Sequence, residues 1–292
     1  MEVTGETKIC GLIGYPVGHS VSPQMHNSAF KALKLNFIYV TFEVKEALLK
    51  AAVEGIKGLG IRGVNVTIPY KVSITNYLNE LRGEASLIGA VNTILNEGGR
   101  LIGFNTDAVG ALRALEAHAA TPIDKKVVVL GAGGAARAIA FALAGKARSI
   151  TIVNRTEDKA LALANELRRE LNANALGKPL TAPTLKDELK DADILINATP
   201  TGMVPNVDQT LVGKELLRSD MAVMDIVYNP LETLLLKEAR KIGAKCIDGL
   251  EMLVQQGAES FRIWTGREPP VRVMRDAALK SLKKVSKIGE NR

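Results

Sequence analysis

Residues 127–136 read Val127-Val-Val-Leu-Gly131-Ala-Gly133-Gly134-Ala-Ala136, an apolar run followed by small residues. The run predicts a buried strand, and positions 131, 133 and 136 follow the G-x-G-x-x-G/A spacing. In that pattern one small residue permits a tight turn, one lets a pyrophosphate approach the backbone, and one lets helix and strand pack closely. The helix N-terminus then attracts phosphate groups. Glycine spacing alone also fits a simple tight turn, but the preceding strand and the alanine-rich helix that follows favour a dinucleotide site.

The residues after the next strand indicate which dinucleotide binds. An NAD site carries an acid about 20 residues beyond the glycines, where it accepts a hydrogen bond from the ribose 2′-hydroxyl. This chain instead has Asn154-Arg155-Thr156, with Lys159 one turn later. Arg155 can pair with a 2′-phosphate and stack on adenine. The neighbouring acids Glu157 and Asp158 suit the N-terminus of a helix. We therefore expect NADP rather than NAD.

The same alternation of strands and helices runs through the whole chain. It predicts two α/β domains with mainly parallel sheets covered by helices, since 292 residues are more than one core usually supports. The predicted strands are 8–15, 37–44, 63–68, 126–130, 149–154, 193–198, 222–227 and 246–248. The predicted helices are 23–33, 45–57, 108–118, one ending near 145, one beginning at 157, 250–264 and 271–287.

Charge argues against a nucleic-acid partner. The chain has 38 basic and 31 acidic residues, a net charge of +7. Residues 280–292 contain five basic residues and one acid, so only +3 is left for the remainder. A basic tail is unlike the basic face with which a folded domain follows nucleic acid, and a mildly positive body suits small anionic ligands. The charged residues of this tail are Lys280, Lys283, Lys284, Lys287, Glu290 and Arg292.

Cysteine, histidine and hydropathy patterns exclude other classes. Cys10 and Cys246 form no C-x-x-C pair, which argues against a disulfide framework and favours a reducing compartment. The apolar stretch 127–145 is interrupted by glycines, so we expect a strand, a turn and a helix rather than a membrane span. We expect no secretory signal, a cytoplasmic protein and no metal site. The three histidines show no ligand spacing: His19, His26 and His118.

Polar residues gather where the strands of the first half end. Ligands of open α/β sheets bind beyond the carboxyl ends of the strands, and alternation places Asn65 and Thr67 on one side of theirs. Each position has a simpler explanation: Ser22 and Asp107 as helix caps, and Lys71 as a solvated lysine. Taken together they favour a substrate crevice. Oxidation of an alcohol also needs proton transfer, for which a Lys–Asp pair is the natural candidate here.

These segments resemble the shikimate dehydrogenase family. The specific ones are Gly14-Tyr-Pro-Val-Gly-His-Ser20-Val-Ser22-Pro, Asn65-Val-Thr-Ile-Pro-Tyr-Lys71, Gly89-Ala-Val-Asn92-Thr and Gly103-Phe-Asn-Thr-Asp107. The resemblance continues through the glycine turn, Asn154-Arg-Thr156, Asn197-Ala-Thr-Pro200, Asp225-Ile-Val-Tyr228 and Asp248-Gly-Leu-Glu-Met-Leu-Val-Gln-Gln256. It implies an N-terminal α/β substrate domain (1–107), a Rossmann-type NADP-binding domain (108–248) and C-terminal helices (249–292) that return to the substrate domain. It also implies reversible, NADPH-dependent reduction of 3-dehydroshikimate to shikimate, in chorismate and aromatic amino-acid biosynthesis.

The resemblance assigns residues position by position. It implies that Lys71 and Asp107 are the catalytic pair. The implied substrate contacts are Ser20, Ser22, Asn65, Thr67, Asn92, Tyr228 and Gln256. The implied cofactor contacts are Gly131, Ala132, Gly133, Gly134 and Ala135 at the diphosphate; Asn154, Arg155, Thr156 and Lys159 at the 2′-phosphate; and Thr199, Ile226, Gly249 and Met252 toward the nicotinamide.

Several alternatives stay open at this stage. The family often has Arg where Lys159 stands, and Lys lacks the planar fork, which predicts a weaker contact with the 2′-phosphate. The acids Glu157 and Asp158 also leave open NAD as a secondary cofactor and a quinate/shikimate dehydrogenase as an alternative. A catalytically silent NADP-binding module is the alternative that is not an enzyme. The sequence does not decide whether Lys71 acts as an acid–base catalyst or as an electrostatic stabiliser, nor whether the protein is a monomer or a homodimer.

Overall fold

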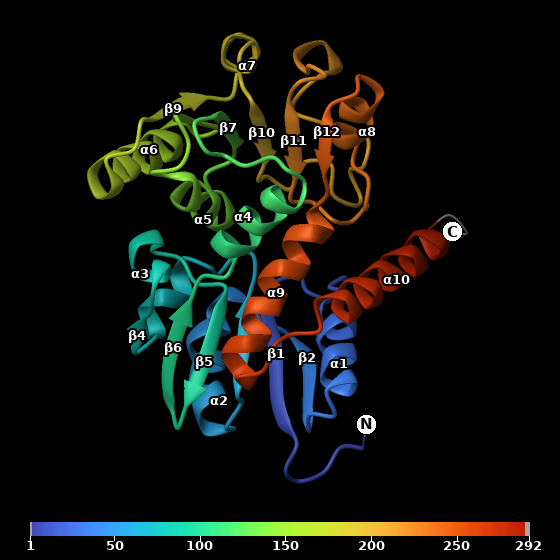
Figure 1. Cartoon of the computed structure of the whole chain (residues 1–292). Helices are drawn as coiled ribbons and strands as arrows, with labels where there is room; N and C mark the ends of the chain where they lie inside the picture. The colour runs from blue at the N-terminus through green and yellow to red at the C-terminus, as the bar shows by residue number, and fades with distance from the viewer. Residues whose placement is uncertain (1, 290–292) are drawn as a thin grey trace. The chain divides into compact units, whose positions relative to one another are not determined.

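The computed structural model describes residues 2–289, with side chains through Lys284. The side chains of Lys287, Glu290 and Arg292 in the basic tail therefore lie outside the described part. The chain divides into two units, Met1–Val109 with Val254–Arg292 (unit 1) and Gly110–Leu253 (unit 2). The divisions fall inside helices α4 (Asp107–Ala117) and α9 (Gly249–Thr265), whereas the sequence led us to expect them before residues 108 and 249. Figure 1 colours unit 2 from green to orange.

Unit 1 contains a six-stranded sheet in the order β2-β1-β3-β5-β6-β4. Its strands are β1 (Lys8–Gly14), β2 (Phe37–Glu43), β3 (Gly63–Val66), β4 (Glu80–Leu81), β5 (Thr93–Glu97) and β6 (Arg100–Phe104). The β1 strand pairs in parallel with β2 and β3, and β6 with β4, but β5 is antiparallel to both β3 and β6. The sheet is therefore mainly parallel, as expected, and β5, for which the sequence predicted no strand, is the exception. Gly98 and Gly99 have φ of +60° and +93°, and such a two-residue turn closes an antiparallel hairpin.

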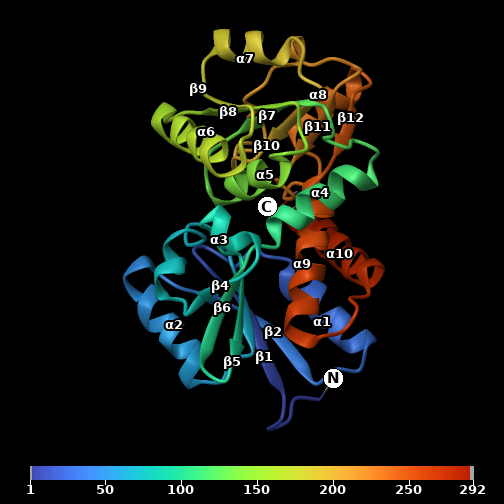
Figure 2. The ribbon, with the colours of Figure 1, turned by 60° about the vertical axis from the view of Figure 1, so that its left-hand side comes forward.

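Helices cover both faces of this sheet (Figure 2). On one side lie α1 (Ser22–Ala32), the unit 1 part of α9, and α10 (Val271–Gly289); on the other lie α2 (Leu49–Gly58) and α3 (Glu84–Ile88). Short 3-10 turns occur at Glu46–Leu48 and Ser73–Tyr77.

Strand β3 shows how the two faces differ. Val64 and Val66 enter the core that α2 covers, which contains Val53 and Ile56. On the opposite face, Gly63 leaves room for Trp264 of α9, whose Nε1 would lie 2.3 Å from any Cβ added at Gly63. The alternation of side chains therefore points Asn65 toward α9.

Unit 2 contains a second six-stranded sheet, and every strand pair in it is parallel. Its strands are β7 (Lys126–Leu130), β8 (Ser149–Asn154), β9 (Ala175–Pro179), β10 (Ile194–Asn197), β11 (Ala222–Asp225) and β12 (Lys245–Ile247), in the order β12-β11-β10-β7-β8-β9. The chain starts at the centre, winds outward to β9, and returns beside β7 as β10. This is the doubly wound nucleotide-binding topology, in which ligands bind where the winding direction reverses.

Apolar residues of this sheet pack against helices. Val128, Leu195 and Val223 form one core with residues of α7 (Ala182–Leu189) and α8 (Leu234–Lys241), while α5 (Gly134–Leu143) and α6 (Glu157–Leu171) pack against β7, β8 and β9. A further 3-10 turn is Lys214–Leu216. The apolar stretch 127–145 is divided between β7 and α5, and no helix among the described residues could cross a membrane.

Candidate active site and dinucleotide site

Lys71 and Asp107 meet in unit 1. Lys71 Nζ donates a hydrogen bond to Asp107 Oδ2 at 2.5 Å, and the two side chains are only 15% and 5% exposed. A charge-assisted bond this short in a mostly dry setting fixes both groups, because either charge alone would be poorly solvated there. The sequence placed both residues at strand ends, and the fold brings them together.

Lys71 and Asp107 are close because both follow strands that end at the same edge of the sheet. Lys71 follows the carboxyl end of β3, and Asp107 follows that of β6. Since β5 runs antiparallel to both neighbours, Asn92 lies at the same edge, just before β5 begins. Its backbone N–H donates to Phe104 O at 3.1 Å, and its carbonyl accepts from Val66 N at 2.8 Å.

Asp107 is the first residue of α4 rather than its cap. The side chain of Asn105 performs the capping, since its Oδ1 accepts from the backbone N–H of Asp107 (3.1 Å) and of Ala108 (3.4 Å). The carboxylate of Asp107 is thereby available to Lys71 through Oδ2 and to Asn92, whose Nδ2 donates to Oδ1 at 2.9 Å. The cap interpretation considered for Asp107 is therefore wrong in this structure.

Gln256 of α9 joins the same group. Asn92 Nδ2 lies 3.3 Å from Gln256 Oε1, and Thr106 Oγ1 lies 3.5 Å from that oxygen. The backbone N–H of Thr106 also donates to Asn92 Oδ1 at 2.7 Å. The amide of Asn92 is thus held at both ends, which fixes the orientation of the group that touches Asp107.

A chain of buried hydrogen bonds leads from the core to this site. Tyr39 Oη donates to Asn65 Oδ1 (2.8 Å), Asn65 Nδ2 donates to Thr93 Oγ1 (3.0 Å), and Thr93 Oγ1 donates to Asn92 Oδ1 (3.2 Å). Ser260 Oγ of α9 accepts from Asn65 Nδ2 at 2.9 Å and lies 2.8 Å from Thr93 Oγ1. Asn65, predicted as a substrate contact, is here a buried member of the network beneath the ion pair.

Three of the remaining predicted substrate residues, Ser20, Ser22 and Thr67, are not part of the hydrogen-bond network around Lys71 and Asp107 among the described residues. Ser20 Oγ accepts from the backbone N–H of Ser22 at 3.2 Å, so Ser20, not Ser22, supplies the polar contact at the start of α1. Thr67 follows β3 and is half-buried. Among the described residues no hydrogen bond joins these three to Lys71 or Asp107. Tyr228 belongs to unit 2, in the half-buried loop after β11, so its part in substrate binding stays a prediction.

The glycine turn of unit 2 has the geometry that a diphosphate needs. Gly131 has φ of +109°, and a Cβ there would lie 3.0 Å from Ala198 O, so a side chain is excluded. Gly133 is exposed, with no heavy atom within 4 Å of a Cβ built on it. The α5 helix begins next at Gly134 without a side-chain cap, which leaves its first N–H groups for a ligand. Ala132, Gly134 and Ala135 complete the turn and are half-buried.

The basic residues after β8 are exposed. Asn154 Nδ2 donates to Thr156 O at 2.8 Å and shapes the loop from which Arg155 projects. Arg155 has no ion-pair partner in the part of the chain that the structure describes, and Lys159 lies one turn into α6. This pair of cations fits a 2′-phosphate, although Glu157 and Asp158 stand beside it in the first turn of the helix.

The four residues predicted near the nicotinamide all come shortly after strands of the unit 2 sheet. Thr199 follows β10 and Ile226 follows β11, while Gly249 and Met252 lie in the first turn of α9. Gly249 packs on the loop after β11, since a Cβ there would lie 2.5 Å from Ile226 O. Met252 is buried.

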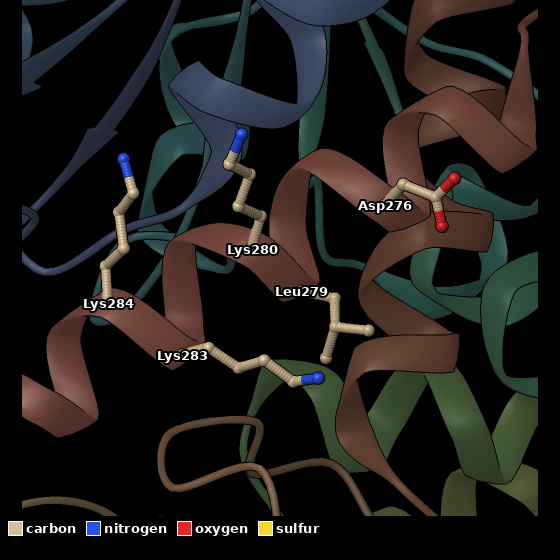
Figure 3. A pocket seen from close by; sticks show the side chains of 5 residues that line it. All are labelled: Asp276, Leu279, Lys280, Lys283 and Lys284. Carbon is tan, nitrogen blue, oxygen red and sulfur yellow. The ribbon is translucent and has the colours of Figure 1, made fainter.

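A hollow along α10 is not the functional site (Figure 3). Its lining residues come from that one helix, and none was predicted to bind a ligand: Asp276, Leu279, Lys280, Lys283 and Lys284. Lys283 extends away from Lys280 and Lys284 in Figure 3, so the three ammonium groups do not converge. Among the described residues, no cluster of His, Cys, Asp and Glu could hold a metal ion.

Sequence reasoning missed Tyr39, Thr93, Asn105, Thr106 and Ser260. Asn105 and Thr106 stand inside the quoted segment that ends at Asp107, and their polarity beside a strand was a usable signal. Ser260 lies four residues after Gln256, a spacing that places two residues on one face of a helix. Thr93 stands beside Asn92 in the quoted segment Gly89-Ala-Val-Asn92-Thr and donates to it, so a local signal existed there. Nothing local marked Tyr39, whose hydroxyl bonds Asn65, 26 positions away.

The fold and the two candidate sites define a class: a two-unit α/β oxidoreductase with a Rossmann-type dinucleotide domain and a candidate active site at Lys71 and Asp107. Family models match three segments of the chain: the shikimate dehydrogenase substrate binding domain over 12–94, shikimate / quinate 5-dehydrogenase over 115–229, and the shikimate 5′-dehydrogenase C-terminal domain over 249–279. The chain belongs to the shikimate dehydrogenase family.

Individual relatives agree with this assignment. The shikimate dehydrogenase (NADP(+)) of Methanocaldococcus jannaschii is 53% identical over 283 residues, which are 97% of this chain and 100% of the relative. A crystal structure of a shikimate dehydrogenase in complex with NADP+ superposes with a TM-score of 0.92 at 51% identity, covering 96% of this chain and 98% of the other. The structure of the Listeria monocytogenes shikimate 5-dehydrogenase, in complex with shikimate and NAD, superposes with a TM-score of 0.87 at 38% identity. The match covers 94% of this chain and 98% of the other.

Proposed function

We propose that this protein is an NADP-dependent shikimate dehydrogenase that reversibly reduces 3-dehydroshikimate to shikimate, as in chorismate and aromatic amino-acid biosynthesis. The observation that carries the proposal is the ion pair of Lys71 and Asp107 at 2.5 Å, with Asn92 bonded to the second carboxylate oxygen. This arrangement supplies a proton donor whose position is fixed before substrate binds.

Lys71 and Asp107 divide the proton chemistry between them. Lys71 Nζ holds the proton that is exchanged with the C3 oxygen of the substrate. Asp107 holds that nitrogen in place through Oδ2, and its own orientation is set by Asn92 and by the cap from Asn105. We propose Gln256 and Asn92, whose amide groups lie 3.3 Å apart at the same edge of the sheet, as contacts of substrate hydroxyls. The further substrate contacts that we propose are Ser20, Ser22, Asn65, Thr67 and Tyr228.

The cofactor that fits unit 2 is NADP. The open space above Gly133 and the uncapped N-terminus of α5 would hold the diphosphate, with Arg155, Thr156 and Lys159 at the 2′-phosphate. When bound, the nicotinamide supplies or accepts the hydride. Glu157 and Asp158 would repel the 2′-phosphate to some extent, which is the reason to test NAD as a secondary cofactor.

The deciding experiment is an absorbance assay at the reduced-nicotinamide band, with shikimate or quinate as substrate and NADP or NAD as cofactor. We expect the highest kcat/KM for shikimate with NADP. Faster turnover of quinate with NAD would identify a quinate/shikimate dehydrogenase instead. Binding of NADPH without any substrate-dependent absorbance change would identify a catalytically silent module.

Assembly and location follow as separate proposals. We propose a small-molecule substrate, no nucleic-acid or membrane partner, a monomer or homodimer, and a cytoplasmic location. Light scattering on the purified protein measures the oligomeric state directly.

A further inference from the structure

Asp225 is a buried carboxyl that the proposed reaction does not use. It ends β11 in unit 2 and is 0% exposed. None of the ion pairs among the described residues includes it. Its partners are three neutral donors: Asn197 Nδ2 (3.0 Å) and the backbone N–H of Val227 (3.0 Å) on Oδ1, and Thr233 Oγ1 (2.7 Å) on Oδ2. A buried acid without a cation is costly, so its retention needs a reason.

One partner organises the loop after β10. Asn197 Oδ1 accepts from both the backbone N–H (3.1 Å) and the Oγ1 (2.7 Å) of Thr199, and its Nδ2 also donates to Thr201 O (3.2 Å). Asp225 orients this amide by accepting from Nδ2, because a flipped amide would turn an oxygen toward the carboxylate. The conformation of residues 198–201 therefore depends on Asp225.

The other two partners belong to the chain after β11. The bond to Val227 N shapes the loop that carries Ile226. Thr233 is the N-cap of α8, where its Oγ1 accepts from Leu236 N at 3.4 Å and donates to Asp225. One carboxyl therefore ties together the loop after β10, the loop after β11 and the start of α8.

The loop after β10 borders the turn predicted to bind the dinucleotide, and the loop after β11 borders Gly249, which is predicted to lie near the nicotinamide. A Cβ on Gly131 would lie 3.0 Å from Ala198 O and 3.1 Å from Thr199 Cγ2, and one on Gly249 would lie 2.5 Å from Ile226 O. The contacts of Gly131 occur where β7 and β10 lie side by side and the winding of the sheet reverses. Small shifts of the loop after β10 would alter the surroundings of the glycine turn, and small shifts of the loop after β11 would alter those of Gly249.

We propose that Asp225, acting through Asn197 and Val227, is a positioning residue for the nicotinamide half of the dinucleotide site. It holds the loops at 198–201 and 226–228 in the conformation that receives the cofactor. This inference rests on the proposed function only for the identity of the cofactor, because the hydrogen bonds that hold the two loops are present whichever dinucleotide binds.

The test compares Asp225→Ala with Asp225→Asn in the full-length protein. NADPH binding is followed by nicotinamide fluorescence at a temperature where circular dichroism shows each variant folded. Asp225→Ala removes the acceptor for all three donors and should raise the Kd for NADPH about tenfold. Asp225→Asn keeps an oxygen for Asn197 and Val227 and should stay within about threefold of wild type. A folded Asp225→Ala protein with wild-type affinity would overturn the proposal.

A second pair of variants separates positioning from stability. Asn197→Ala and Thr233→Val each remove one donor to Asp225. Thr233 leads into α8, so Thr233→Val should lower Tm and leave the Kd for NADPH unchanged. Asn197→Ala should raise that Kd and accelerate amide hydrogen exchange at 198–201 in the cofactor-free protein. Equal changes of Kd in both variants would reduce Asp225 to a stabilising residue.

Failure of this proposal is distinguishable from failure of the proposed function. If the wild-type protein binds NADPH but oxidises no shikimate, the function is wrong, and the binding and exchange measurements still decide the role of Asp225.

Discussion

The candidate substrate site of unit 1 and the candidate dinucleotide turn of unit 2 are built by different means. In unit 1, hydrogen bonds join Lys71 to Asp107, Asp107 to Asn92, and Asn92 to Gln256. The network below them is buried. In unit 2, the turn depends on backbone conformation at Gly131, while Arg155 and Lys159 are exposed. The first site is positioned by its own side chains, and the second leaves its charges for the phosphate groups of a ligand.

The sharpest test of this difference is Lys71→Ala. We expect kcat to fall on the order of 10²–10⁴-fold with little change in the KM for shikimate, because the lysine acts mainly in the transition state. Tm should also fall, since Asp107 loses the cation beside it. Steady-state kinetics and thermal melting measure both effects, with Lys50→Ala, an exposed lysine of α2, as the control. A Lys71→Ala enzyme with wild-type turnover would refute the assignment.

Arg155→Ala should produce the opposite combination of effects. The KM for NADPH should rise about 10–100-fold, the loss expected for charge-assisted bonds to one phosphate, and the KM for NADH should change little. Because Arg155 is exposed and has no described ion-pair partner, Tm should stay constant. Arg169→Ala, at the other end of α6, is the matched control. Equal effects on both cofactors would contradict a 2′-phosphate contact.

A drop in pH should change the stability of the two units in opposite directions, through one buried titratable group in each. His26 of unit 1 is fully buried and stacks on Tyr39 with ring centroids 4.5 Å apart, and neither of its ring nitrogens has a hydrogen-bond partner among the residues that the structure describes. Burial lowers the pKa of His26 from 6.5 to about 3. Between these values the unfolded chain binds a proton that the folded chain does not, so stability falls as pH drops below about 6.5, by up to about 1.4 kcal/mol per pH unit. His26→Leu should make the loss of Tm between pH 7 and pH 5 smaller.

Asp225 of unit 2 provides the contrast. Burial raises the pKa of Asp225 from 3.8 to about 6, so here the folded chain binds the extra proton and acid stabilises it across that window. Asp225→Asn should therefore make the acid loss of Tm steeper. The same slope in His26→Leu, Asp225→Asn and wild type would show that neither group governs the acid response.

Tyr39→Phe should have the smallest effect. It removes the donor to Asn65 Oδ1 and leaves that buried oxygen without this bond, a loss of about 1–3 kcal/mol in stability. We expect a lower Tm and a kcat within about fivefold of wild type, because Asn65 is still held by Asn92 O and Ser260. Tyr15→Phe, at an exposed position, is the control. An unchanged Tm would show that the network beneath the ion pair adds no stability.

Local signals predicted the elements around the glycine turn well. The bounds expected for β7 and β8 match the structure, since each is a short β-branched run bounded by polar or glycine residues. Strand β9 was missed because its sequence, Ala175-Leu-Gly-Lys-Pro179, contains two residues that disfavour strands. Gly177 is needed there because β9 packs on α6, where a Cβ would lie 2.5 Å from the backbone of Ala160.

The amino-acid sequence by itself determined the α/β class and the turn of small residues after β7, and it predicted which residue types form the candidate active site. These follow from periodicity, glycine spacing and polar residues at strand ends, all of which act within a few positions of the chain. Only the tertiary structure decided which side chains meet: Lys71 with Asp107 across 36 positions, and Asn65 with Ser260 across 195. Such pairs form only when the antiparallel β5 joins the sheet and the C-terminal α9 packs against it. No local propensity encodes these long-range contacts.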